Sequence, residues 1–205
     1  MTFLSRSDLK NIAENIKNNN NYDDNYLGKT NPKHNYGCLM LEVNFNNWNN
    51  CLKLVNDDIV YDDEKQSFGK ETDPHITILF GFDNDSTDKN KLKNLVLTHI
   101  NNKPITFNIM GLSYFEGDKF DTLKFDIESN DLNQLNELCK NNFKYSSDFL
   151  DYHAHLTISY IKKGVLNDNY KYRFDKPFVM TSNSFVYSSK INDNDKDKFR
   201  FNVTL

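Results

Sequence analysis

The sequence has few glycines and few cysteines, and both shortages limit what the protein can be. None of its 7 glycines forms a G-x-G-x-x-G or Walker arrangement, which excludes a glycine-rich phosphate-binding loop. The 3 cysteines, Cys38, Cys51 and Cys139, lie far apart and include no C-x-x-C pair, so neither a zinc ribbon nor a disulfide framework is expected. This cysteine usage is typical of a reducing cytoplasm.

Long apolar runs are also missing. No segment approaches the ~18 consecutive apolar residues of a membrane-spanning helix. The stretch Met1–Lys17 has no apolar core of the length found in signal peptides. We therefore expect a cytoplasmic protein that does not bind a membrane.

A basic excess is absent as well. The net charge is −4 and the isoelectric point is about 5.7, with lysine and arginine interspersed among aspartate and glutamate. Proteins that bind long RNA or DNA usually carry a basic surface, because contacts to phosphates supply most of the affinity. We expect no long nucleic acid as a partner, and a small anionic ligand in a local pocket fits this composition better.

The sequence does contain enough apolar material for a folded core, with 38% hydrophobic and 14% aromatic residues in a chain of 205. Residues 1–35 are predicted to form a short helix at Ser7–Lys17 and an asparagine-rich linker, and residues 36–205 to form a single domain. Within this domain the pattern predicts a helix over Asp88–Ile100 and a strand over Ile105–Phe115.

The domain contains an internal repeat. Tyr36–Val55 aligns with Phe120–Cys139 at an offset of 84 residues, and in both copies a strand with alternating apolar residues leads into a helix. The matched apolar positions are Leu39 with Leu123, Leu41 with Phe125, Val43 with Ile127, Trp48 with Leu132, and Leu54 with Leu138. An apolar strand carrying His-x-Thr follows each copy. The repeat predicts a bilobed α+β fold of two pseudo-symmetric strand–helix–strand units, with mainly antiparallel sheets, and places Trp48 in the core.

The two His-x-Thr strands are "HITIL", which begins at His75, and "HLTISY", which begins at His155. Side chains alternate between the two faces of a strand. This rule predicts one face with His75, Thr77 and Leu79 opposite Ile76, Ile78 and Phe80, and one with His155, Thr157 and Ser159 opposite Leu156, Ile158 and Tyr160. If the units are related by a pseudo-twofold axis, the two His-Thr faces meet across a central groove.

Paired histidines and threonines suit the cleavage of a phosphodiester. One neutral histidine can take a proton from an attacking hydroxyl, and one protonated histidine can give a proton to the leaving oxygen. Threonine hydroxyls can donate hydrogen bonds to the non-bridging phosphate oxygens, where negative charge increases. This chemistry requires no metal and no other cofactor, and the sequence does not decide which histidine is the acid.

The paired "HITI" and "HLTI" resemble the H-x-T-x motifs of the two-histidine (2H) phosphoesterase superfamily. The stretches "YGCLMLEVNFNNW", "DPHITILFGF", "YFEGDKFDTLKFDIES" and "DYHAHLTISYIKKG" look closest to one branch, the phage anti-CBASS phosphodiesterases that cleave cyclic oligonucleotides. The resemblance implies a bilobed α+β fold with a central groove. It also implies an acid–base pair, His75 and His155, two phosphate-binding residues, Thr77 and Thr157, and a cyclic di- or trinucleotide substrate with 3′–5′ linkages.

Nucleobases need flat partners, because stacking on an aromatic ring stabilises a bound base by about 1–3 kcal/mol. Tyr36, at the start of the first predicted strand, and Phe115, just before the second unit, are the candidates for this substrate-binding role.

Three other interpretations stay open. His153, His155 and His75 could form a three-histidine metal site, although no carboxylate or cysteine has a supporting spacing. The same catalytic site could act on RNA ends with a 2′,3′-cyclic phosphate, as in the 2′–5′ RNA ligase-like members of the superfamily. A non-catalytic protein could bind a cyclic nucleotide and sequester it.

Overall fold

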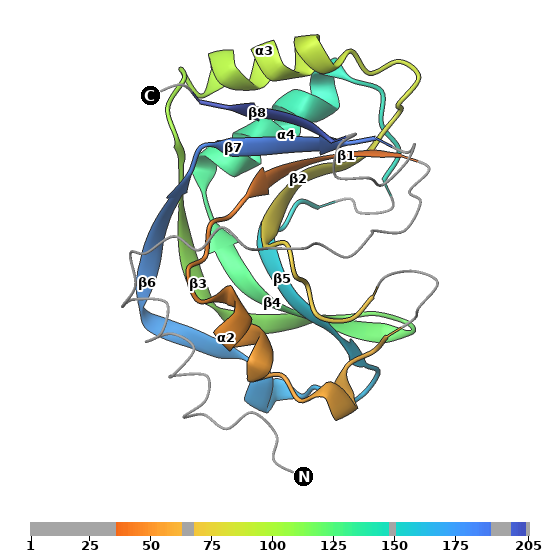
Figure 1. Ribbon diagram of the computed structural model, residues 1–205, viewed down its shortest axis with the longest axis vertical. Helices are drawn as coiled ribbons and strands as arrows, with labels where there is room; N and C mark the ends of the chain where they lie inside the picture. Colours follow the sequence, from red (N-terminus) through yellow and green to blue (C-terminus); the bar gives the residue numbers. More distant parts are fainter. Residues whose placement is uncertain (1–35, 63–67, 148–150, 190–197, 204–205) are drawn as a thin grey trace.

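The computed structural model describes residues 36–62, 68–147, 151–189 and 198–203, and the helix and linker predicted in residues 1–35 lie outside these ranges. Figure 1 shows a bent sheet with helices packed on it. The strands are β1 (Gly37–Glu42), β2 (His75–Phe82), β3 (Ile105–Glu116), β4 (Phe120–Glu128), β5 (His155–Lys162), β6 (Tyr172–Ser182), β7 (Ser184–Ser188) and β8 (Phe199–Asn202). The helices are α2 (Trp48–Lys53), α3 (Lys89–His99) and α4 (Asn130–Asn142), with 3-10 turns η1 (Asp57–Ile59) and η2 (Asp168–Tyr170).

All eight strands of the described chain belong to one antiparallel sheet, in the order β6-β3-β4-β5-β2-β1-β7-β8. The predicted repeat units are β1–α2–β2 and β4–α4–β5, and they lie side by side with β2 and β5 at the centre of the sheet. The two units are joined where Ile76 pairs with Leu156. The α+β fold built from two pseudo-symmetric strand–helix–strand units is therefore confirmed.

The predicted helix over Asp88–Ile100 and strand over Ile105–Phe115 are confirmed as α3 and β3. The carboxylate of Asp88 caps α3, because it accepts hydrogen bonds from the backbone N–H groups of Asn90 and Lys91 at 2.8 and 3.1 Å. In the described part of the chain, no helix is long and apolar enough to cross a membrane.

The helices cover the apolar face of the sheet, and each repeat helix crosses to the other unit. Helix α2 contacts β5, and helix α4 contacts β2. Trp48 of α2 is 3% exposed and packs against Phe45 and Phe125, with ring centroids 5.5 and 6.5 Å away, which confirms the core position predicted for it. The core of one unit is thus completed by the helix of the other.

The strict alternation predicted along the two His-x-Thr strands is wrong beyond the threonines. Leu39 pairs with Leu79 while its neighbour Met40 pairs with Thr77, so Ile78 is an extra residue in a β-bulge. The bulge turns Leu79 into the core and places Phe80 beside Cys38 and Met40 on the histidine face.

The second unit has the same bulge at the equivalent place. Leu123 pairs with Ser159 and Lys124 pairs with Thr157, which leaves Ile158 as the extra residue. Ser159, which is fully buried, therefore points to the core side of the sheet, as Ile158 does. Tyr160 is the next residue on the same face as His155. The face shared by His75, Thr77, His155 and Thr157 is called the His-Thr face below.

Candidate active site

The two histidines are brought together by the central strand pair. His75 is the first residue of β2, and His155 is the first residue of β5. Around the pair formed by Ile76 and Leu156, an antiparallel arrangement places His75 next to Thr157 and Thr77 next to His155. Because Ile76 and Leu156 are fully buried in the core, the four flanking side chains lie on the opposite face. The structure thus brings all four predicted catalytic residues to one place.

Each histidine ring is held by the same local hydrogen bond. Nδ1 of His75 lies 2.7 Å from the carbonyl oxygen of Asp73, and Nδ1 of His155 lies 2.7 Å from the carbonyl oxygen of His153. A carbonyl oxygen can only accept, so Nδ1 carries the proton and donates in both rings. Nε2 is therefore the nitrogen of each ring that can exchange a proton with a substrate.

Hydrogen bonds hold Thr77 in place at its hydroxyl and at its backbone carbonyl oxygen. The hydroxyl of Thr77 is hydrogen-bonded with the thiol of Cys38, whose pKa burial raises to about 12 in spite of this bond. Tyr152, three residues before His155, donates from its hydroxyl to the carbonyl oxygen of Thr77 at 3.0 Å. Thr157 is 9% exposed. The hydrogen bond from Tyr152 therefore connects the segment that precedes the second motif to the first motif.

An aromatic ring, an ammonium and a carboxylate surround His155, and the sequence did not identify them as its neighbours. Its ring meets the ring of Phe115 edge to face, with centroids 5.0 Å apart and an interplanar angle of 87°. Lys124, which pairs with Thr157, holds its Nζ over Phe115 at 4.1 Å and is bound to Asp126, the strand partner of His155.

These surroundings lower the pKa of His155. Burial of the ring is the main cause, the charges of Lys124 and His75 add to it, and the backbone hydrogen bond to His153 and the charge of Asp126 act in the opposite direction. The net effect favours the neutral ring, which is the form that accepts a proton.

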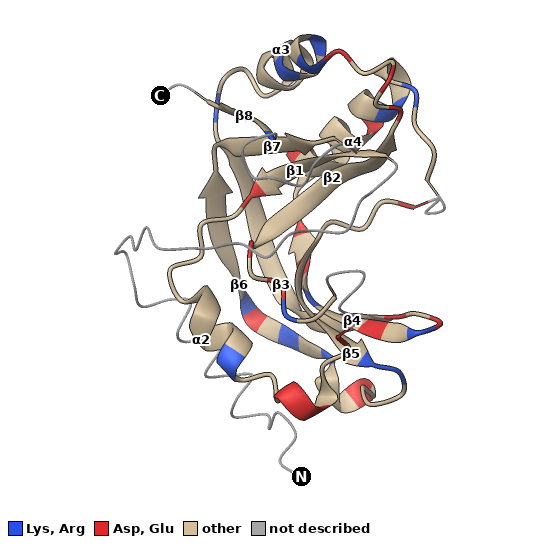
Figure 2. Cartoon of the chain, turned by 45° about the vertical axis from the view of Figure 1, so that its right-hand side comes forward, with Lys and Arg blue, Asp and Glu red and all other residues tan. Residues whose placement is uncertain are grey.

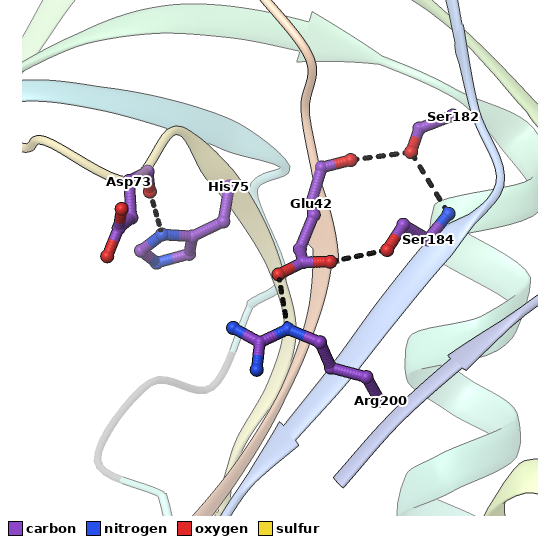
Figure 3. Close-up of polar contacts among 6 residues, drawn as sticks. All are labelled: Glu42, Asp73, His75, Ser182, Ser184 and Arg200. Carbon is purple, nitrogen blue, oxygen red and sulfur yellow. Dashed lines mark hydrogen bonds and ion pairs between the residues drawn. The ribbon is translucent and has the colours of Figure 1, made fainter. Parts of the chain in front are cut away.

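A carboxylate stands opposite each histidine. Glu42 pairs with His75 across β1 and β2, and Asp126 pairs with His155 across β4 and β5. Figure 3 shows the Glu42 carboxylate between the hydroxyl of Ser184 and Nε of Arg200, which lies 3.1 Å from it. Asp126 is bound in the same way, by Ser113 at 2.7 Å and by Lys124.

Sequence reasoning missed these carboxylates, although a signal was present. The repeat offset of 84 residues that relates the two units also relates Glu42 to Asp126, so the acidic residues are repeat-equivalent. Lys124 has no such signal, because its equivalent is Met40.

The two predicted base-stacking residues lie at different distances from the histidines. Phe115 contacts His155 directly, and one face of its ring is occupied by the Lys124 ammonium. Tyr36 is 43% exposed and packs edge to face on Phe80, with centroids 6.5 Å apart. Tyr36 therefore lies further along the His-Thr face, beyond Thr77.

The alternative three-histidine metal site has no geometric support. Among the described residues no group of three or more His, Cys, Asp or Glu side chains is arranged to hold a metal ion. The exposed His153 contributes its carbonyl oxygen, not its ring, to the contact with His155.

The cysteines cannot serve as nucleophiles at neutral pH. Burial raises the pKa of Cys38, Cys51 and Cys139 to about 12, so their thiolates are scarce. What the site offers is two imidazoles with exchangeable Nε2 positions, two hydroxyl donors and a neighbouring ammonium. This set can carry out acid–base chemistry on an anionic group.

Solved structures of other proteins share the architecture. Usb1 of Kluyveromyces marxianus matches with a TM-score of 0.50 and 8% identity, over 83% of this chain and 99% of that chain. TT0787 of Thermus thermophilus matches with a TM-score of 0.48 and 13% identity, over 82% and 95% of the two chains. A phosphoesterase matches with a TM-score of 0.49 and 10% identity, over 83% and 99%.

The likeness to Usb1 confirms the predicted α+β fold. No family model matches the sequence, and no curated protein matches it either. At this level of identity the structural likeness concerns the fold alone.

Proposed function

We propose that the protein is a metal-independent phosphodiesterase that cleaves cyclic di- or trinucleotides at 3′–5′ linkages. The observation that carries the proposal is the pairing of two His-x-Thr motifs on β2 and β5, with both Nδ1 atoms bound to carbonyl oxygens. The fold of the 2H phosphoesterase type, shared with Usb1, agrees with this class of reaction.

In the proposed reaction His155 is the general base, because the causes that lower its pKa keep it neutral. Its Nε2 takes the proton of a ribose 2′-hydroxyl, and the 2′-oxygen forms a bond to the adjacent phosphorus. The bond from phosphorus to the 5′-oxygen breaks, and protonated His75 gives its Nε2 proton to that oxygen. The product is a linear nucleotide with a 2′,3′-cyclic phosphate and a 5′-hydroxyl.

Thr77 and Thr157 donate hydrogen bonds to the non-bridging oxygens while the phosphorus has five oxygen neighbours. Such donors are most effective where charge increases in the transition state, and each is typically worth about 10²–10³-fold in rate.

The choice of a cyclic nucleotide rests on three observations. The motif context resembles that of the anti-CBASS enzymes, which remove the messengers of a bacterial defence and so allow a phage to evade it. Tyr36 gives the His-Thr face an exposed aromatic ring. Figure 2 shows lysine and arginine mixed with aspartate and glutamate over both halves of the described chain, a distribution that suits a short ligand.

The test is a panel of cyclic di- and trinucleotides, together with an RNA ending in a 2′,3′-cyclic phosphate, with the products resolved by mass spectrometry. Cleavage of a cyclic nucleotide that persists in excess EDTA is expected. Faster cleavage of the RNA end would show that the RNA end, and not the cyclic nucleotide, is the preferred substrate. If the wild-type protein binds the cyclic nucleotide but the amount of intact cyclic nucleotide does not fall, the function is sequestration.

Substitution tests the roles of the two motifs. His75→Ala and His155→Ala should each lower kcat by about 10²–10⁴-fold while binding persists, because each removes one proton transfer. The matched control is His99→Ala, on the exposed end of α3, which should leave kcat unchanged. A wild-type rate in either active-site variant would contradict the mechanism.

A further inference from the structure

A pocket of about 420 Å³ opens at the far end of β2 from His75, a volume within the range of small-ligand sites. Its lining includes Tyr36, Gly81, Asp83, Asp85, Lys144 and Tyr145. Tyr36 and Tyr145 are 43% and 41% exposed, and among the described residues only Phe115 and Val179 are other large apolar side chains with comparable exposure. Two exposed rings in one pocket offer a stacking surface for a flat ligand.

The pocket is preformed by a short ladder between two segments. The backbone N–H of Ser146 donates to the carbonyl oxygen of Gly81 at 2.8 Å, and the N–H of Asp83 donates to the carbonyl oxygen of Lys144 at 3.0 Å. Gly81 has a φ of +101°, and a Cβ there would lie 1.8 Å from the Ser146 carbonyl oxygen. Only glycine allows this close approach, so the backbone holds Tyr145 in place beside β2.

Tyr36 connects the pocket to the His-Thr face. The ring of Tyr36 packs on Phe80, and Phe80 pairs with Cys38, whose thiol contacts Thr77. Because Ile78 is bulged, the partners of Thr77 and Phe80 on β1, Met40 and Cys38, are two residues apart, which is about 7 Å along the sheet. This span is comparable with one nucleotide, so a phosphate between the histidines brings an attached base to the pocket.

The polar lining selects among ligands. Asp83 and Asp85 bring two carboxylates, which disfavour a second phosphate and accept hydrogen bonds from base N–H groups. Lys144 adds one ammonium, a donor for a base carbonyl. Guanine presents two adjacent N–H donors and a carbonyl oxygen on one edge, a pattern complementary to a carboxylate and an ammonium.

We propose that this pocket binds a guanine base of the cyclic nucleotide, with the ring stacked on Tyr145 or Tyr36 and its donor edge on Asp83 or Asp85. The proposal rests on the function proposed above, because the phosphate attached to that guanosine is then the one between His75 and His155. It adds base specificity, which the two His-x-Thr motifs do not supply.

The test compares kcat/KM for cyclic di-GMP, cyclic di-AMP and 2-hydroxypropyl 4-nitrophenyl phosphate, a diester that has a neighbouring hydroxyl but no base. Tyr145→Ala should lower kcat/KM for cyclic di-GMP by about 5- to 150-fold, the equivalent of 1–3 kcal/mol of stacking, and leave the base-free diester within twofold. Tyr145→Phe keeps the ring and should retain the wild-type value. Asp83→Asn combined with Asp85→Asn should reduce the preference for cyclic di-GMP over cyclic di-AMP.

Equal losses on both diesters, or no loss on either, would overturn the pocket assignment. A wild-type preference for cyclic di-AMP would overturn the choice of guanine. If the wild-type protein cleaves none of the three compounds, the proposed function fails, and calorimetry decides the pocket by itself. In that case cyclic di-GMP must bind the wild-type protein and must bind Tyr145→Ala at least 5-fold more weakly, and equal binding would reject the pocket.

Discussion

At the residue scale, the two histidines share their anchoring and differ in their neighbours. Both rings donate from Nδ1 to a carbonyl oxygen two residues earlier, and both face a carboxylate on the adjacent strand. The difference lies at the position next to the threonine, where Lys124 pairs with Thr157 and Met40 pairs with Thr77. This position of the repeat therefore distinguishes the two halves of a nearly symmetric site, and the charge of Lys124 adds to the burial that lowers the pKa of His155.

Replacing Lys124 by its repeat-equivalent residue tests this asymmetry. Lys124→Met removes one of the charges that lower the pKa of His155, and it leaves Asp126, which raises that pKa, without its cation. The pKa of His155 should rise, so the low-pH limb of the kcat/KM profile, where the base becomes protonated, should move to higher pH. Lys140→Met, which removes an ion pair with Glu137 on α4, is the control and should not move the limb. A limb that moves to lower pH would contradict the assignment of His155 as the base.

The four motif residues could be predicted from the sequence because the repeat gives each motif a partner at the equivalent place. Tyr145 and Lys124 could not be predicted. Tyr145, between α4 and β5, approaches Phe82 through an isolated bridge, and Lys124 matters through its pairing with Thr157 and its contacts with Phe115 and Asp126. Such contacts depend on the tertiary register of the strands, which residue periodicity does not contain.

At the element scale, the two β-bulges set the direction of the strands that leave the site. The carbonyl oxygen of each extra residue is satisfied by a segment of the other unit. The side-chain amide of Asn136 on α4 donates to Ile78 at 2.7 Å, and the backbone N–H of Glu71 donates to Ile158 at 2.9 Å. The sequence predicted strands in both places and missed both bulges, because a bulge is a property of the pairing and not of one strand's pattern.

The bulge in β2 should depend on Asn136, which is 2% exposed. Asn136→Ala leaves the carbonyl oxygen of Ile78 buried without its donor, so the free energy of unfolding should fall by about 1–3 kcal/mol. Because the bulge follows Thr77, kcat should fall as well. The control is Asn142→Ala on the same helix, whose exposed amide donates to the carbonyl oxygen of Leu138, and it should cost less than about 0.5 kcal/mol. Urea unfolding and steady-state rates of both variants measure the difference, and equal stability of the two would refute the role of Asn136.

At the scale of the whole molecule, the exchange of helices makes the two units interdependent. Helix α2 completes the core on β5, helix α4 completes it on β2, and a single cluster of buried side chains extends through both units. The repeat in the sequence predicted two related units, but it could not show that each would bury its helix against the other. A site whose halves come from both units requires this rigid connection, because His75 and His155 must keep one relative position.

The chain should therefore unfold as one cooperative body, and its single tryptophan reports on this. Trp48 lies on α2 against Phe125, whereas Leu92 is fully buried on α3. Helix α3 contacts α4 and lies at the opposite end of the described chain from α2 (Figure 1). Leu92→Ala should lower the free energy of unfolding by about 2–5 kcal/mol. In a coupled molecule the urea midpoint from Trp48 fluorescence moves together with the midpoint from far-ultraviolet circular dichroism. Thr98→Ala, at an exposed position of the same helix, should leave both midpoints in place. Two separate transitions, with the fluorescence midpoint of Leu92→Ala unchanged, would show that the units fold independently. In that case the shared core would not be what aligns the two histidines.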